Sequence, residues 1–145
     1  MITYCPLCGS GIAFDAVVDE ETLEFGVSGL LYNSDVLPYD RETESLWSQL
    51  EYKSISGPMA GKELNILSTA NTTWKNWREK YPETFVLSEE TGFIRDYSRN
   101  PYPGYETSST LFFPVSAQNE EFHSKEMVIG ITINGKSKAY PFSEL

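Results

Sequence analysis

The chain has 145 residues, a length that fits one domain of ordinary size. Apolar residues make up 40% and charged residues 22%, which excludes a disordered tail, a fibrous repeat and a membrane protein. The 11 basic and 21 acidic residues give a formal net charge of −10, so a nucleic-acid partner and attraction to anionic lipid are both disfavoured. No apolar run is long enough to insert into a membrane, and we expect no signal peptide within this chain.

The first half of the chain predicts short antiparallel strands, because apolar and β-branched residues alternate with turn residues. Residues 19–22 are expected to close a hairpin. The expected strands are residues 2–4, 12–18, 23–27, 30–33, 36–39, 46–52, 63–67 and 85–87.

One segment, residues 72–81, predicts a helix. Residues 71–73 offer N-cap side chains, and Pro82 ends the pattern. Trp74 and Trp77 share one helical face, so we expect both rings to be buried anchors of the core.

The second half combines an aromatic loop with a hairpin. Residues 91–114 are rich in Pro, Gly and aromatic rings, which predicts a long, ordered, irregular loop packed onto the body. Asn134-Gly135 between residues 127–133 and 136–141 is a strong hairpin signal. We therefore predict a single α+β, β-rich domain over residues 1–145, with mostly antiparallel short strands in a sheet or a partly open barrel and with one main helix.

The motif Cys5-Pro6-Leu7-Cys8 is the constellation with the clearest chemical purpose. Two thiols at this spacing can form a disulfide or chelate one soft metal ion. The amides of residues 9–11 are expected to stabilise a thiolate. A permanent disulfide or two buried, inert thiols would be the purely structural alternative.

The remaining soft ligands limit which metal the motif can hold. A tetrahedral zinc site needs four ligands, and His123 is the only histidine, so zinc would need carboxylates, water or a second chain. Copper(I) requires fewer soft ligands, and two thiolates with or without His123 or a methionine would suffice. His123 also fits a surface residue in a polar stretch.

A second group of polar residues marks a candidate pocket. Carboxylates close in sequence can bind a cation or perform acid–base chemistry, although such runs are often solvated turns, and an Arg–Asp pair in the aromatic loop can be structural. We expect residues 29–50 to pack against the Cys5–Cys8 turn. The candidate pocket residues are Asn33, Asp35, Asp40, Arg41, Trp47, Gln49, Arg95 and Tyr97.

The whole pattern resembles the DUF3179 family of bacterial and archaeal proteins of unknown function. The resemblance rests on Thr-Tyr-Cys-Pro-Leu-Cys-Gly-Ser from Thr3, on Ser-Leu-Trp-Ser-Gln from Ser45 and on blocks spread over nearly the whole chain. It implies an exported or membrane-anchored setting for many members. Members usually carry a further stretch before the Cys motif, so the resemblance leads us to expect an N-terminally truncated family domain.

Three classes of function follow from these observations. The favoured one is a thiol-based module in which Cys5 and Cys8 bind copper or zinc or exchange with a thiol partner. The alternatives are an enzyme whose site lies around Asp35, Asp40 and Gln49, with structural cysteines, and a structural or interaction domain. The sequence leaves the metal, the substrate and the oligomeric state open.

Overall fold

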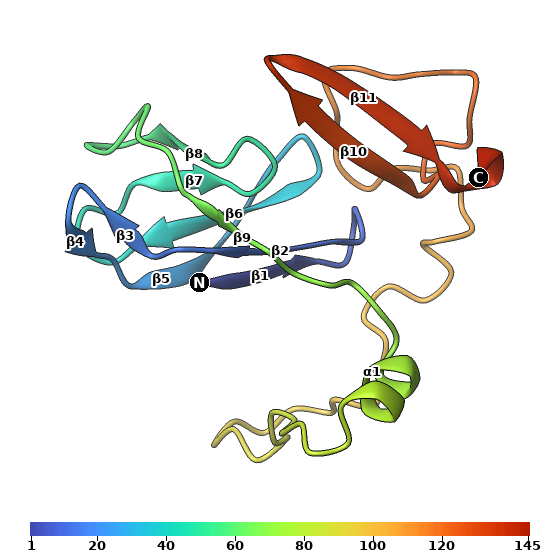
Figure 1. Ribbon diagram of the computed structural model, residues 1–145, viewed down its shortest axis with the longest axis horizontal. Coiled ribbons are helices and arrows are strands. Elements are labelled where there is room, and N and C mark those ends of the chain that lie inside the picture. The colour runs from blue at the N-terminus through green and yellow to red at the C-terminus, as the bar shows by residue number, and fades with distance from the viewer.

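The computed structural model describes residues 1–145 as a β-rich body with one α-helix and two elements that project from it (Figure 1). The strands are antiparallel and form separate open sheets. The α+β class predicted from the sequence is therefore confirmed, with sheets in place of a barrel. The helices lack the length and apolar character needed to span a bilayer.

A three-stranded sheet carries the cysteine motif. Its order is β1 (Ile2–Cys5), β2 (Ser10–Phe14) and β9 (Ile66–Leu67). Cys5 and Ser10 are directly paired, so the motif is the tight connection of a hairpin. The amide of Gly9, which has a φ of 67°, donates to the carbonyl of Cys5 at 2.9 Å and closes the turn.

The strand expected over residues 12–18 is divided in the structure. The main chain leaves β2 after Phe14, and a second hairpin follows from β3 (Val17–Val18) and β4 (Glu21–Thr22). Asp19 and Glu20 form its two-residue turn with φ values of 51° and 69°. The prediction of one strand over residues 12–18 was wrong. The turn has two residues and is therefore shorter than the predicted connection 19–22, and Val17 and Val18 pair with the strand that follows it.

A four-stranded meander forms the second sheet. Its strands are β5 (Phe25–Tyr32), β6 (Asp35–Asp40), β7 (Leu46–Ser48) and β8 (Lys53–Ser56) in that order. The expected strands 23–27 and 30–33 merge into β5, which is interrupted by a bulge.

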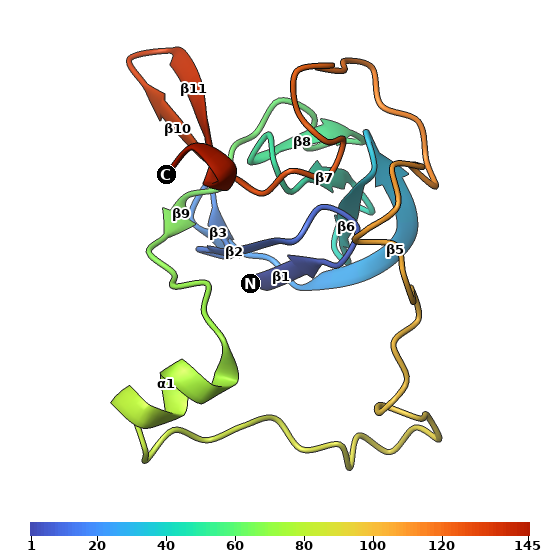
Figure 2. The ribbon, with the colours of Figure 1, turned by 90° about the vertical axis from the view of Figure 1, so that its right-hand side faces the viewer.

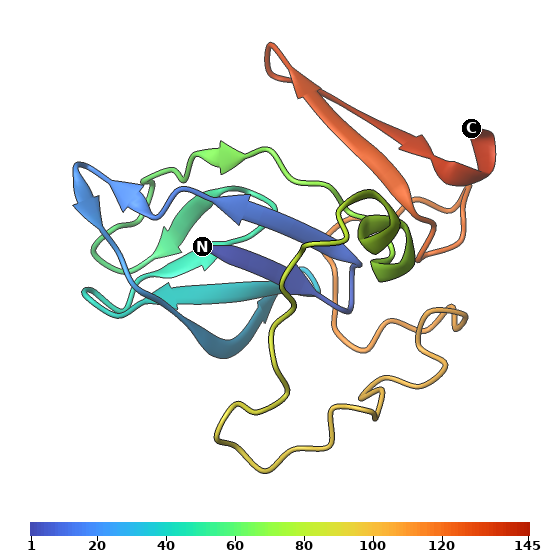
Figure 3. The ribbon, with the colours of Figure 1, turned by 60° about the horizontal axis from the view of Figure 1, so that its bottom comes forward.

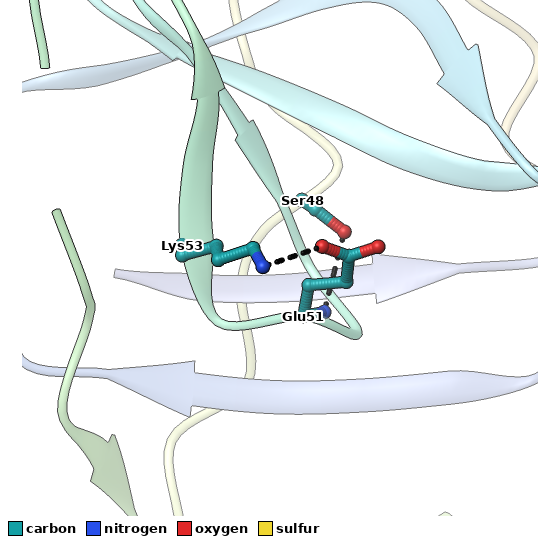
Figure 4. A network of polar contacts seen from close by, with 3 residues as sticks. All are labelled: Ser48, Glu51 and Lys53. Carbon is teal, nitrogen blue, oxygen red and sulfur yellow. Dashed lines mark hydrogen bonds and ion pairs between the residues drawn. The ribbon is translucent and has the colours of Figure 1, made fainter. Parts of the chain in front are cut away.

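Two tight turns of this meander position the candidate site. Asn33 and Ser34, both at positive φ, reverse the chain between β5 and β6. Between β7 and β8, Ser48 Oγ accepts from the amide of Glu51 at 3.2 Å, and Lys53 Nζ lies 3.2 Å from Glu51 Oε2 (Figure 4). These contacts close the turn that contains residues 49 and 50, so the expected strand 46–52 ends at Ser48.

The core lies between the two sheets. Phe14 of β2 and Trp47 of β7 pack with Val18, Leu23 and Leu64, and all five residues are buried. This cluster joins the sheets and therefore holds the cysteine turn against the meander.

Helix α1 (Trp74–Lys80) confirms the predicted helix, and Thr73 caps it by accepting from the amide of Asn76 at 3.3 Å. The predicted burial of its tryptophans was wrong. No residue of α1 is buried, and Trp74 is 47% exposed. Trp77 packs locally on Tyr81, with ring centroids 4.4 Å apart. The spacing of the aromatic residues correctly predicts a helix. The rings would be buried only if another surface of the protein covered them, and the body does not cover α1.

The aromatic loop divides into two parts. Tyr102, Tyr105 and Phe112 form a cluster in which Tyr105 is buried, so this part packs as expected. Residues 82–101 instead run outside the body (Figure 2). Phe85 and Leu87 are 98% and 97% exposed and form no strand, so the strand expected there was wrong.

The C-terminal hairpin confirms its prediction. Strands β10 (Val128–Ile133) and β11 (Lys136–Pro141) pair around Asn134 and Gly135, whose φ values are 50° and 72°. A short 3-10 turn, Phe142–Glu144, follows. The hairpin projects away from the body in every view (Figures 1 to 3).

Candidate functional site

The two cysteines occupy different positions in one tight turn. Cys5, the last residue of β1, is fully buried, whereas Cys8 at the third turn position is exposed. Both are free thiols. The turn therefore buries Cys5 completely, whereas Cys8 keeps exposed surface although its sulfur lies against the buried carboxylate of Asp35.

Asp35 joins the cysteines from a distant part of the chain. It is the first residue of β6, directly after the Asn33–Ser34 turn, and is only 3% exposed. Its Oδ1 atom lies 3.3 Å from Cys8 Sγ, and Oδ2 accepts from the amide of Leu50 at 3.2 Å. One ligand atom from each of Cys5, Cys8 and Asp35 lies within 4.8 Å of the others.

A chain of hydrogen bonds with a defined direction supports Cys8. Thr3 Oγ1 donates its only proton to the carbonyl of Ile12 at 3.0 Å, so it accepts from Gln49 Nε2 at 2.8 Å. This orients Gln49 Oε1 towards Ser10 Oγ, which donates to it at 2.8 Å. Because Ser10 has then used its proton, Ser10 Oγ at 2.8 Å and Asp35 Oδ1 at 3.3 Å are alternative acceptors for the single proton of the Cys8 thiol.

The electrostatics of the turn separate the two thiols. The pKa of Cys5 is lowered to about 6, chiefly by a hydrogen bond from Cys8, and this effect outweighs the opposing effect of burial. The pKa of Cys8 is raised by its hydrogen bond to Cys5 and by burial, and the Asp35 carboxylate adds to the increase. The metal-free pair therefore loses one proton near neutral pH and retains the other.

Other groups in the turn adjust these values. The amides of Leu7 and Cys8 lower the pKa of Cys5, and the Ser10 amide acts on Cys8. Stabilisation of a thiolate by main-chain amides was expected from residues 9–11. Amides within the Cys-Pro-Leu-Cys motif contribute as well, because the turn directs them at the sulfur of Cys5. Burial raises the pKa of Asp35.

A thioether also lies over the cysteine turn. A Cβ atom added to Gly9 would lie 3.3 Å from Met127 Sδ, so the Met127 side chain packs directly on the turn next to Cys8. His123, the other soft ligand considered from the sequence, is exposed, accepts from the amide of Lys125 through Nδ1, and lies outside the three-residue group.

The structure divides the polar residues proposed for a pocket. Asp35 and Gln49 contact the cysteine turn, which is the expected contact of residues 29–50 with that turn. Asp40 instead accepts from Trp47 Nε1 at 2.8 Å and from Thr43, within the buried core. Asp40 and Trp47 therefore stabilise the meander and do not belong to the group formed by Cys5, Cys8 and Asp35.

The other proposed residues lie further out. Asn33 accepts from the amide of Ser116 and ties that segment to the β5–β6 turn. Arg41 is exposed, with its guanidinium 5.7 Å from the centre of the Tyr39 ring. Arg95 and Tyr97 lie in the exposed segment 82–101. No ion pair forms between Arg95 and its neighbouring aspartate, whose carboxylate accepts from a serine.

Sequence reasoning missed the residues that orient the site. Thr3 and Ser10 flank the motif, and the amide of Leu50 holds Asp35. A hairpin register drawn across the Cys-Pro-Leu-Cys turn would have paired Cys5 with Ser10. No local signal identifies Leu50, because its role depends on how the two sheets pack.

Comparison with known proteins gives a family without an assigned activity. The family model described as "Protein of unknown function (DUF3179)" matches residues 1–145. Searches of curated proteins and of solved structures found no match.

Proposed function

The chain belongs to the DUF3179 family, and from the geometry of the site we propose that Cys5, Cys8 and Asp35 bind one metal ion, zinc or copper(I). The two thiolates supply soft sulfur ligands and the carboxylate supplies a hard oxygen ligand, a mixed set that suits zinc. Copper(I) would use the two sulfurs alone.

The observation that carries this proposal is the buried carboxylate beside the thiols. Asp35 Oδ1 faces Cys8, and a single amide donor serves the other oxygen. A buried carboxylate next to ionisable sulfurs accumulates negative charge, which is unfavourable unless a cation compensates it. The negative charge of Asp35 also raises the pKa of both thiols, which a bound cation would reverse.

The spacing of the ligand atoms supports this assignment. Zinc–sulfur and zinc–oxygen bonds of about 2.3 and 2.0–2.2 Å place tetrahedral ligand atoms roughly 3.5–3.8 Å apart. The three atoms here lie within 4.8 Å of one another, so small side-chain rotations would bring them to that distance. Three protein ligands leave a fourth position for water or a substrate, as in zinc sites that perform chemistry.

The hydrogen-bonded residues around Cys8 would orient this ligand. Binding requires Cys8 to lose its proton, after which Ser10 can rotate and donate to the sulfur. Gln49 would keep Ser10 beside the sulfur through its amide nitrogen, which donates to the Ser10 carbonyl at 3.4 Å. Removing such a partner typically weakens metal binding about 10–100-fold, so Gln49→Ala should bind the ion more weakly in this range.

Metal titration of the reduced protein tests the proposal. We expect one equivalent of zinc per chain, loss of binding in Cys5→Ser and Cys8→Ser, and weakened binding in Asp35→Asn. The matched control is Asp96→Asn, which removes an exposed carboxylate outside the site. Copper(I) competition separates the two metals, because Asp35→Asn should weaken zinc binding and leave copper(I) binding nearly unchanged. Equal metal binding by the wild type and the Cys5→Ser/Cys8→Ser variant would contradict the proposal.

A dithiol–disulfide couple is the second candidate, favoured by the lowered pKa of Cys5 beside an exposed thiol. In this reaction a small-molecule disulfide accepts two electrons and two protons, two thiols are released, and the Cys5–Cys8 bond forms. A free-thiol count after equilibration with glutathione redox buffers tests it. A pair that stays reduced under oxidising buffer, while zinc still binds, excludes this candidate and leaves metal binding standing.

A further inference from the structure

The thioether of Met127 lies on the cysteine turn and takes no part in the hydrophobic core. Met127 immediately precedes β10 and is 48% exposed, whereas Met1 and Met59 pack against the core cluster. A Cβ atom added to Gly9 would lie 3.3 Å from Met127 Sδ and 3.4 Å from Met127 Cε, with no other Met127 atom within 4 Å. The sulfur and its methyl group are therefore the atoms that contact the residue after Cys8.

Hydrogen bonds hold the main chain on both sides of Met127. The amide of Phe142 donates to the carbonyl of Met127 at 2.9 Å. Two residues earlier, Lys125 Nζ donates to the carbonyls of Ser108 at 2.6 Å and Thr110 at 2.9 Å. The Met127 side chain thus extends over the turn from a main chain that is already ordered, which reduces the entropy lost when its sulfur binds an ion.

The segment that leads to Met127 also contacts the turn that precedes Asp35. Ser34 Oγ donates to the carbonyl of Phe113 at 2.7 Å, and the Ser34 carbonyl accepts from Cys5 Sγ at 3.8 Å. Residues 113–127 therefore meet the candidate site at two places, at this turn and at the cysteine turn.

Chemical softness determines which ion could use the Met127 sulfur. A thioether is a soft ligand that suits copper(I), whereas zinc sites use thiolate, imidazole and carboxylate groups. Of the three groups proposed to bind a metal, copper(I) would use only the two thiolates, which leaves a position for another soft ligand. His123 is the other soft side chain considered, but it is exposed and lies outside the three-residue group.

We propose that Met127 is the third ligand for copper(I), so that the site holds copper(I) with Cys5, Cys8 and Met127. Zinc would instead use the two thiolates and Asp35, and the inference rests on that proposed metal site. Methionine has three rotatable side-chain bonds, so rotation can turn its sulfur from Gly9 towards the adjacent Cys8. A neutral thioether adds no negative charge to two thiolates around a monovalent ion, whereas a carboxylate ligand would.

Nuclear magnetic resonance of the methionine methyl groups tests this ligand directly. Copper(I) has a filled d shell and is diamagnetic, so the signals of protein labelled with carbon-13 in these methyl groups stay sharp when it binds. One equivalent of copper(I) added to the reduced protein should shift the Met127 signal and leave the Met59 signal in place. Zinc should shift the Met127 signal much less, because it would not bind the thioether. Met127→Leu assigns the signal.

Affinities provide the second measurement, by competition with a chromogenic copper(I) chelator in the absence of oxygen. Met127→Leu keeps the apolar character and approximate size of the side chain. It should bind copper(I) at least about tenfold more weakly, since even the loss of an indirect partner of a metal ligand has this effect, and should bind zinc as the wild type does. The matched control is Met59→Leu, which removes a thioether packed on the core and should leave both affinities unchanged.

The outcomes separate this inference from the proposed metal site. Equal copper(I) affinity of the wild type and Met127→Leu, or an unshifted Met127 signal, would overturn the inference and leave the metal site standing. Equal weakening of copper(I) and zinc binding in Met127→Leu would also overturn it, because Met127 would then act only by packing on the turn. A wild type that binds neither metal would overturn the metal site together with this ligand.

Discussion

Replacing Trp47 with phenylalanine tests how the core holds the site. Trp47 is fully buried, and its indole nitrogen donates to Asp40 Oδ2 at 2.8 Å. The same residue begins the segment that supplies Gln49 and the Leu50 amide to the thiol site. The substitution removes this hydrogen bond and part of the ring volume, with no change in the rest of the chain.

The expected loss of stability follows from two contributions. A hydrogen bond to a charged group contributes about 1.5–3 kcal/mol to the free energy of unfolding. The phenyl ring is roughly 40 Å³ smaller than the indole, which adds about 1 kcal/mol for the cavity. The total, about 2.5–4 kcal/mol, corresponds to a fall in melting temperature of about 5–15 °C for a chain of this size.

The pH dependence of the stability difference provides a second, independent test of this prediction. Burial raises the pKa of Asp40, but hydrogen bonds from Trp47 and Thr43 outweigh it and hold that pKa below its usual value. Ionised Asp40 therefore stabilises the fold above about pH 4, and this stabilisation is lost as the pH falls through the lowered folded-state pKa. The difference between wild type and Trp47→Phe should accordingly be largest near pH 7 and shrink below pH 4.

Urea unfolding monitored by circular dichroism at pH 7 and pH 3 measures both effects. Trp74→Phe is the control, because Trp74 is half exposed on α1 and its replacement should change stability by less than about 0.5 kcal/mol. Equal midpoints for the two variants at pH 7, or a Trp47→Phe penalty that does not shrink at pH 3, would refute the reasoning.

Three further predictions use other parts of the molecule. The ultraviolet absorbance of a thiolate in reduced, metal-free protein should titrate near pH 6 and vanish in Cys5→Ser, because the pKa of Cys5 is lowered to about 6, and a thiolate that forms only above pH 8 would contradict this. Gly57→Ala should unfold more easily than Gly61→Ala, since both glycines have positive φ but only at Gly57 would the new Cβ lie 2.7 Å from Ser45 Cα; equal thermal midpoints would contradict this. Trp77→Ala should cost about 1 kcal/mol or less, because α1 has no buried residue, and a loss of 3–5 kcal/mol on urea unfolding would show that the helix packs on the core.

Local chemistry explains what could be predicted from the sequence. Asn134-Gly135 determines a tight turn because both residues accept positive φ, and Thr73 followed by a helix-forming run determines α1. The spacing of Cys5 and Cys8 likewise determines two sulfurs in one turn. These features depend on a few neighbouring residues, so they follow from the sequence without knowledge of the packing.

Strand geometry explains why the carboxylates could not be sorted in advance. Asp35 and Asp40 are close in sequence and equally suited to a site, but they are the two ends of β6. Asp40 lies five positions after Asp35, so the strand separates them by roughly 17 Å, and this odd spacing directs their side chains to opposite faces of the sheet. One therefore reaches the cysteines and the other reaches Trp47 in the core.

Sequence motifs and patterns are enough to predict the family, the β-rich class and the thiol pair at the candidate site. They do not reveal which third group joins the thiols, because Asp35 is 27 positions from Cys8 and reaches it through the packing of the two sheets. The same holds for burial of the aromatic rings. A helical or alternating pattern marks an apolar face, but whether that face is covered depends on the surface opposite it, which for α1 and the β10–β11 hairpin is absent from the chain's own body.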